Sequence, residues 1–301
     1  MVPFGRVVVS FGVILACASP PATAQAPAQP RSPTVRPETG GAGGNVNISP
    51  KRVIFREKDR GTTVVLFNQG SGTTTYALEL ADHYMDAGGA VREPAQGQPL
   101  PAAVHSARSM VTFAPHRVTL APGQSQIVKI RLQRPANLPA GEYRTHLAVT
   151  NLPPAEAGLT AQQAFDPTGR RLAFQVVALY RISIPLIVRQ GPADVQARIA
   201  GARFVPQQTN VARGLSAVDV DLVRQGASSL YGDVEVHASN GKKSELVGRM
   251  RGAAVYPEVE RRTVRVALAR PVQRSERLSV TYRDDDTRSG QPIAKADVLV
   301  R

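Results

Sequence analysis

Residues 172–189 read LAFQVVALYRISIPLIVR, and this stretch decides the fold class. Leu172, Phe174, Val176 and Ala178 occupy every second position, which places them on one face of a β-strand. A typical strand has about five to six residues, so a strand this long is expected to project past its sheet or to pass from one partner to another. A break into two consecutive strands near residues 181–185 is the alternative.

The same alternation, interrupted by Gly, Pro and Asn turns, appears on both sides of this stretch and is typical of all-β proteins. Further strands are expected at residues 46–55, 62–68, 75–82, 111–113, 117–120, 126–133 and 143–152, and then at 217–223, 231–238, 246–250, 262–269, 277–282 and 294–301. Asn240-Gly241 between two of these segments predicts a β-hairpin.

Gln190-Gly191-Pro192 interrupts the pattern and marks the expected domain boundary. The prediction is an all-β chain of two immunoglobulin-like β-sandwich domains. Residues 46–190 would form the N-terminal domain and residues 191–301 the C-terminal β-sandwich domain.

The first residues predict export from the cytoplasm. Arg6 precedes an apolar run over residues 7–18, and Ala22-Thr23-Ala24 offers small residues for cleavage, so residues 1–24 are interpreted as a signal peptide. Cleavage there would remove Cys17, the single cysteine; lipidation of Cys17 is the alternative. Residues 25–45 are rich in Pro, Ala and Gly and are expected to form a flexible linker.

The charge of the chain is strongly positive, with 37 Lys and Arg against 23 Asp and Glu, for a net charge of +14. Such a charge suits an acidic partner, a nucleic acid or an anionic membrane surface. The basic residues lack the interleaved aromatic residues that single-stranded nucleic-acid binding requires. No later apolar segment reaches the length of a membrane-spanning helix. No nucleic acid and no membrane span are therefore expected.

The sequence contains no recognisable catalytic constellation, and no enzymatic activity, cofactor or metal site is expected. The five histidines lack the spacing of metal ligands. The cluster of Asp82, His83 and Asp86 is interpreted as a turn at a strand end, with a metal site as the alternative. Asp284-Asp285-Asp286 resembles part of a calcium loop, but it lacks the Gly and the final Glu and is interpreted as a solvated turn.

Several segments, in this order, resemble the periplasmic chaperones of pilus (fimbrial) assembly, and especially a divergent, archaic-type branch of that family. They are residues 48–55 (ISPKRVIF), 63–68, 113–115 (FAP), 120–124 (LAPGQ), 138–147 (LPAGEYRTHL) and 180–185 (YRISIP). The resemblance covers residues 46–190. Beyond them it rests on the β pattern and on residues 230–233 (LYGD).

The resemblance implies a boomerang of two domains that captures one pilus subunit at a time in the periplasm. Each subunit lacks its last strand, and the chaperone lends its own strand by donor-strand complementation. Leu172, Phe174, Val176 and Ala178 are the expected donor residues. An outer-membrane usher would be the second partner.

The resemblance also implies two basic residues that bind the C-terminal carboxylate of the subunit. Arg52 matches the first position. The second position falls near Ser183, which is not basic, so its role is assigned to Arg181, with Arg189 as a further candidate. A surface-exposed strand arginine is the alternative for both Arg52 and Arg181.

Two other functions fit the same sequence. One is a secreted adhesin or structural surface module, which would be indifferent to charge reversal at Arg52. The other is a basic scaffold for an anionic polymer, whose binding would depend steeply on salt.

Overall fold

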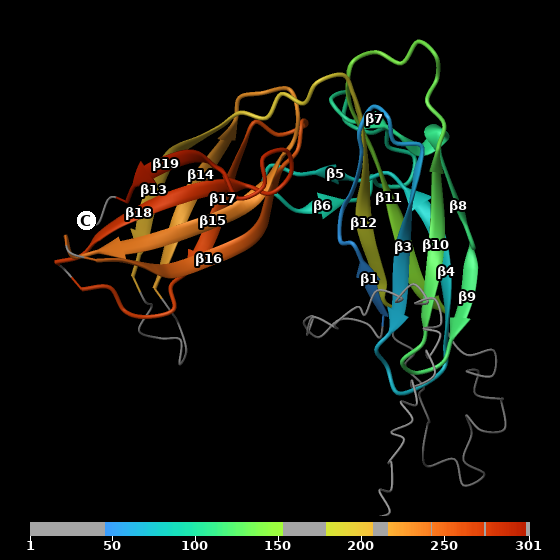
Figure 1. Cartoon of the computed structure of the whole chain (residues 1–301), viewed down its shortest axis with the longest axis horizontal. Helices are drawn as coiled ribbons and strands as arrows, with labels where there is room; N and C mark the ends of the chain where they lie inside the picture. Colours follow the sequence, from blue (N-terminus) through green and yellow to red (C-terminus); the bar gives the residue numbers. More distant parts are fainter. Residues whose placement is uncertain (1–45, 153–178, 207–215, 242, 274, 299–301) are drawn as a thin grey trace, which may run out of the picture. The chain divides into compact units, whose positions relative to one another are not determined.

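The computed structural model describes residues 46–152, 179–206, 216–241, 243–273 and 275–298 (Figure 1). Within these residues, strands make up nearly all of the regular structure, with one short 3₁₀ helix, η1 (Arg108–Met110). They form two β-sandwiches, each with its own hydrophobic core. The predicted all-β fold of two sandwiches is confirmed.

The first sandwich consists of two sheets. One has the order β1-β3-β10-β8, and the other has the order β2-β12-β11-β4-β9 with β7 beside β11. The bounds are β1 (Val46–Ser49), β2 (Val53–Phe55), β3 (Gly61–Asn68), β4 (Thr74–Ala81), β7 (His105–Ser106), β8 (Val111–Ala114), β9 (Arg117–Leu120), β10 (Ser125–Leu132), β11 (Gly141–Leu152) and β12 (Arg181–Gln190). A hairpin of β5 (Tyr84–Met85) and β6 (Val91–Arg92) follows β4.

The single strand expected at residues 46–55 is two strands, which is a correction. β1 pairs antiparallel with β3 in the first sheet, whereas β2 runs parallel to β12 in the second. Pro50 lies between them and has no N–H to donate to a ladder. The chain therefore changes sheets here, and Arg52 lies directly before β2.

Strand β10 shows how alternation builds the first core. Val128, Ile130 and Leu132 are buried, while Ile127 and Arg131 are exposed on the opposite face. The alternating strand expected at residues 126–133 is confirmed. Burial of the inward-facing side chains stabilises the sandwich by about 1.5–3 kcal/mol for each of them.

The second sandwich pairs a sheet of order β13-β14-β17 with a sheet of order β16-β15-β18-β19. The bounds are β13 (Ala197–Val205), β14 (Ala217–Arg224), β15 (Leu230–Ser239), β16 (Ser244–Val255), β17 (Arg261–Ala267), β18 (Arg277–Asp284) and β19 (Pro292–Asp297). β15 and β16 form the hairpin predicted from Asn240-Gly241, with Gly241 at a φ of 86°. Strand β13 was not predicted, because Gly201 and a bulge between Ile199 and Gly201 interrupt its alternation.

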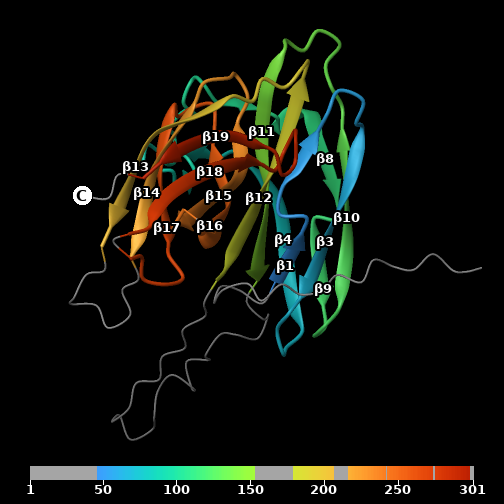
Figure 2. The same ribbon diagram turned by 60° about the vertical axis from the view of Figure 1, so that its left-hand side comes forward.

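The long segment at residues 172–189 is described from Leu179 onward. Its second half forms β12, which pairs along its whole length with β11, and Figure 2 shows these two strands side by side. Residues 1–24 with Cys17, the linker at residues 25–45, and Leu172, Phe174, Val176 and Ala178 lie outside the described residues.

Candidate functional site

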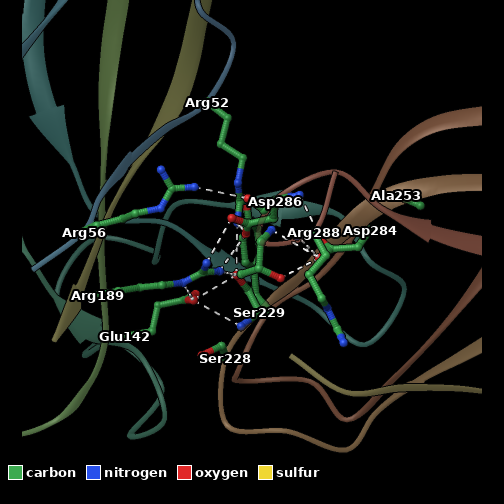
Figure 3. A network of polar contacts seen from close by, with 12 residues as sticks. Arg52, Arg56, Glu142, Arg189, Ser228, Ser229, Ala253, Asp284, Asp286 and Arg288 are labelled. Carbon is green, nitrogen blue, oxygen red and sulfur yellow. Dashed lines mark hydrogen bonds and ion pairs between the residues drawn. The ribbon is translucent and has the colours of Figure 1, made fainter. Parts of the chain in front are cut away.

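Arg52 lies in the short connection between β1 and β2, where the chain passes from one sheet to the other. Its side chain reaches residues of the second sandwich (Figure 3). Its Nη2 donates to Ser229 Oγ at 3.1 Å and to Asp286 Oδ2 at 3.2 Å. The guanidinium carbon lies 4.6 Å from the centre of the Tyr231 ring. Only 7% of the side chain is exposed, so the surface-exposed alternative for Arg52 is excluded.

Arg189, near the end of β12, contacts the same two residues. Its Nη1 and Nη2 donate to Asp286 Oδ1 and Oδ2 at 3.0 and 2.7 Å. Its Nε donates to Glu142 Oε2 at 3.1 Å. Burial disfavours its charge, but the hydrogen bonds and charges of Asp286 and Glu142 outweigh burial and raise the pKa of Arg189. All three nitrogens of this guanidinium are therefore engaged within the chain.

Glu142 and Ser229 complete this polar network. Glu142 Oε2 accepts hydrogen bonds from the backbone N–H of Ser229 at 3.1 Å and from its hydroxyl at 3.0 Å. Two guanidinium groups, Arg52 and Arg189, face two carboxylates, Glu142 and Asp286, so the network is balanced in charge. Arg52 Nε is buried and has no hydrogen-bond partner among the residues that the structure describes. One donor of the network therefore remains available.

The loop after β18 holds Asp286 in place. Asp284 accepts hydrogen bonds from the backbone N–H groups of Asp286, Thr287 and Arg288 at 3.0, 3.2 and 2.7 Å. The side chains of Asp284 and Asp286 are buried, and only Asp285 of the three is exposed. The interpretation of residues 284–286 as a solvated turn is therefore wrong for two of the three.

A second buried ion pair joins Arg144 of β11 to Glu258. The guanidinium carbon of Arg144 lies 3.8 Å from the centre of the Tyr256 ring, and Arg52 Nη1 lies 3.5 Å from the hydroxyl of the same tyrosine. A cation–π contact contributes more stabilisation in desolvated surroundings than at an exposed site. Tyr256 thus connects the Arg52 network to the Arg144 pair.

Two buried histidines lie beside this pair. The rings of His83 and His146 are 4.3 Å apart between their centres. Burial, followed by the charges of neighbouring groups that include Arg144, lowers the pKa of His146 to about 2. Burial also lowers the pKa of His83, although its ring lies 3.3 Å from Glu93. Both rings are therefore neutral at physiological pH.

Arg181 lies elsewhere on β12, at the first residue of the strand. Its guanidinium forms ion pairs with Glu79 at 2.7 Å and Glu93 at 2.8 Å, and 36% of the side chain is exposed. It shares no partner with Arg52. The structure therefore joins Arg52 to Arg189, through Asp286 and Ser229. Arg181 lies eight positions before Arg189 on the same strand, or about 26 Å away along it.

Strand β12 has an open edge over its first half. Its residues Leu186 to Val188 pair with β2, and its other side pairs with β11 from Arg181 to Gln190. Within the described residues no strand pairs with the outer edge between Arg181 and Pro185. Unpaired N–H and C=O groups at such an edge can accept another strand.

Sequence reasoning missed the roles of Glu142, Ser229 and Asp286. Each contact spans a long stretch of chain, such as 97 positions between Arg189 and Asp286, and periodicity reports only local structure. Within the described ranges no group of His, Cys, Asp and Glu is placed to hold a metal ion. No helix there has the length and apolarity needed to cross a membrane.

Neither a protein-family model nor a curated protein matches the chain. It is similar to solved structures of pilus and fimbrial chaperones. The CupB2 chaperone of Pseudomonas aeruginosa is 13% identical, with a TM-score of 0.40, over 83% of this chain and 98% of that one. The E. coli chaperone DraB is 14% identical, with a TM-score of 0.41, over 85% and 96%.

A third similar structure is a complex of a chaperone and a tip subunit, CsuC-CsuE, from archaic chaperone-usher Csu pili of Acinetobacter baumannii. It is 14% identical, with a TM-score of 0.41, over 85% of this chain and 98% of that one. These structures belong to the family that the sequence resembles.

Proposed function

We propose that this chain is a non-enzymatic periplasmic chaperone that captures pilus subunits by donor-strand complementation and delivers them for assembly at the outer membrane. The observation that carries the proposal is the edge of β12 between Arg181 and Pro185, which no described strand covers and which belongs to the second half of the segment of residues 172–189. An open edge provides main-chain hydrogen bonds, and an alternating segment provides side chains for the pockets of a partner.

The alternation of β12 supports this function. Ile184, Leu186 and Val188 are buried in the first core, and Ile182 packs against it. The same every-second-residue spacing, continued toward the N-terminus in the sequence, reaches Leu172, Phe174, Val176 and Ala178. A strand that continued the alternation would present them as one apolar row, and burying Leu, Phe or Val in the groove of a subunit would contribute about 1.5–3 kcal/mol each. They are the proposed donor residues.

The carboxylate anchor is proposed to consist of Arg52 and Arg181. Arg189, the further candidate, has all three nitrogens engaged by Glu142, Ser229 and Asp286 and is better explained as a structural residue. Asp286 would keep both hydrogen bonds from Arg189 if Arg52 turned to another carboxylate. The buried, unpartnered Nε of Arg52 favours such an exchange, because an added acceptor would satisfy it.

The remaining parts of the proposal follow from the sequence. Residues 1–24 direct export to the periplasm and are removed, and residues 25–45 form a linker. Residues 46–190 form the domain that binds the subunit, and residues 191–301 form the second β-sandwich domain. Pilus subunits and an outer-membrane usher are the proposed partners, without a cofactor.

Co-expression tests the proposal. The chain is produced in the periplasm together with a small secreted β-protein encoded beside it, and one partner carries an affinity tag. A chaperone should co-purify with this protein in an equimolar complex and raise its soluble amount. A secreted adhesin or surface module would leave the yield of the small protein unchanged, and that result contradicts the proposal.

A further inference from the structure

The first sandwich contains a basic cavity that the proposed function does not use. It has a volume of about 420 Å³. Its lining consists of Arg60, Thr112, Arg131, Leu132, Gln133 and Arg134. None of these residues belongs to β12, so the cavity is separate from the open edge.

Strand register brings these side chains together. Arg131 of β10 lies opposite Thr112 of β8 on one side and opposite Gly61 of β3 on the other. Arg60 directly precedes β3, and its carbonyl accepts the N–H of Leu132 at 2.9 Å. The cavity therefore lies at one end of the sheet β1-β3-β10-β8, where three arginines converge.

Arg134 is fixed in position without being neutralised. Its Nη1 donates to the carbonyl of Asp59 at 2.6 Å, and its Nη2 donates to the carbonyls of Phe55 and Arg56. Its Nε is buried and has no hydrogen-bond partner in the described parts of the chain. Carbonyl oxygens orient a guanidinium, but they do not cancel its charge.

The other two arginines have no partner in the part of the chain that the structure describes. Neither the Arg60 nor the Arg131 side chain forms a hydrogen bond or an ion pair there. Asp59 and Glu57 are the acidic groups that act on Arg134, and neither lines the cavity. Among the described residues that line the cavity, every polar side chain is a hydrogen-bond donor at physiological pH, and none is a carboxylate.

We propose that this cavity binds a phosphate group. The planar fork of a guanidinium matches two oxygens of a phosphate, and the Thr112 hydroxyl and Gln133 amide can donate to the others. None of the described lining residues is aromatic, so they offer no surface on which a nucleobase could stack. The phosphate group is either free inorganic phosphate or the headgroup of an anionic lipid.

Calorimetric titration of the purified protein with inorganic phosphate, at an ionic strength held constant with sodium chloride, tests the proposal. The test variant is Arg60→Gln with Arg131→Gln. The control is Arg117→Gln with Arg198→Gln, which removes the same charge from two exposed arginines without an ion pair. Saturable binding should weaken about tenfold or more for each cavity guanidinium removed, and the control should bind like the unchanged protein.

Vesicles separate the two sources. Phosphatidylglycerol vesicles should sediment the protein, and phosphatidylcholine vesicles should not, if the ligand is a lipid headgroup; inorganic phosphate should then release the protein. Binding of phosphate without vesicle binding assigns the site to the free anion. Binding of neither probe, or equal weakening in the test and control variants, overturns the proposal.

Discussion

Arg189 and Asp286 form a buried bidentate ion pair, with distances of 3.0 Å from Nη1 to Oδ1 and 2.7 Å from Nη2 to Oδ2. The pair joins the end of β12 to the loop after β18. Exposed ion pairs contribute little to stability, whereas breaking a buried one leaves a charge without compensation. Asp286 also accepts a hydrogen bond from Arg52, so one carboxylate serves two guanidinium groups.

Replacement of Asp286 by Asn should therefore destabilise the protein strongly. Arg52 and Arg189 would be left with Glu142 as the remaining carboxylate of the network, and the free energy of unfolding should fall by about 3–5 kcal/mol. Denaturant unfolding followed by circular dichroism measures the change. Asp285→Asn is the matched control, because Asp285 is the exposed neighbour and should change stability by less than about 0.5 kcal/mol. Equal effects of the two substitutions would contradict the role assigned to Asp286.

Arg52→Ala should reduce the free energy of subunit binding by more than it reduces the free energy of unfolding. Asp286 keeps its two hydrogen bonds from Arg189 in this variant. Loss of one partner of a desolvated charge pair costs about 2 kcal/mol or more in binding, which corresponds to about 30-fold in affinity. Surface plasmon resonance with a captured subunit measures the ratio of the two dissociation constants, for the variant and for the unchanged protein. Thermal unfolding reports the stability of the variant.

Arg181→Ala distinguishes the two proposed anchors. Arg181 is partly exposed and forms ion pairs at the surface, so its removal should change stability little. A loss of subunit affinity similar to that of Arg52→Ala would support its role as the second anchor. Affinity equal to that of Arg117→Ala, an exposed arginine of β9, would show that Arg181 takes no part.

His146 should make the protein less stable in acid. Its pKa is lowered from 6.5 to about 2 in the folded chain, mainly by burial. Below pH 6.5 the unfolded chain gains a proton at this residue that the folded chain does not bind. The stabilising effect is therefore complete above the unfolded pKa and is lost as pH falls, at about 1.4 kcal/mol for each pH unit below about pH 6.

Denaturant unfolding at pH 7, 6 and 5 checks this slope for the unchanged protein and for His146→Gln. The variant lacks the titrating ring but keeps His83 and the carboxylates, so the difference between the two slopes reports His146 alone. The variant should lose less stability between pH 7 and pH 5. Parallel pH profiles would contradict a neutral, buried imidazole.

Much of the fold follows from local patterns in the sequence. The strict alternation from Ile127 to Leu132 predicts β10, and Asn240-Gly241 predicts the hairpin of β15 and β16. Sequence fails where a pattern is interrupted. The bulge at Gly201 conceals β13, and the apolar residues on both sides of Pro50 resemble one strand although they belong to two sheets.

The polar network is harder to predict because burial of a charge depends on partners that are distant in sequence. Arg52 is identified by a resemblance, but nothing local distinguishes the buried Arg189 from the exposed Arg181, eight positions earlier on the same strand. The difference arises from Asp286 and Glu142, which lie on other elements. A run of three aspartates is usually solvated, and the hydrogen bonds of Asp284 make this one an exception.

The alternation of residues 172–178 between two faces of the proposed donor strand offers the most direct test of strand donation. Phe174→Asp with Val176→Asp places two charges on the proposed donor face, whereas Gln175→Asp with Val177→Asp places two charges on the opposite face of the same segment. Co-purification of the subunit with each variant is measured against the unchanged protein. The first pair should abolish the complex while the second retains it; complexes that survive the first pair, or fail equally with both, would contradict strand donation.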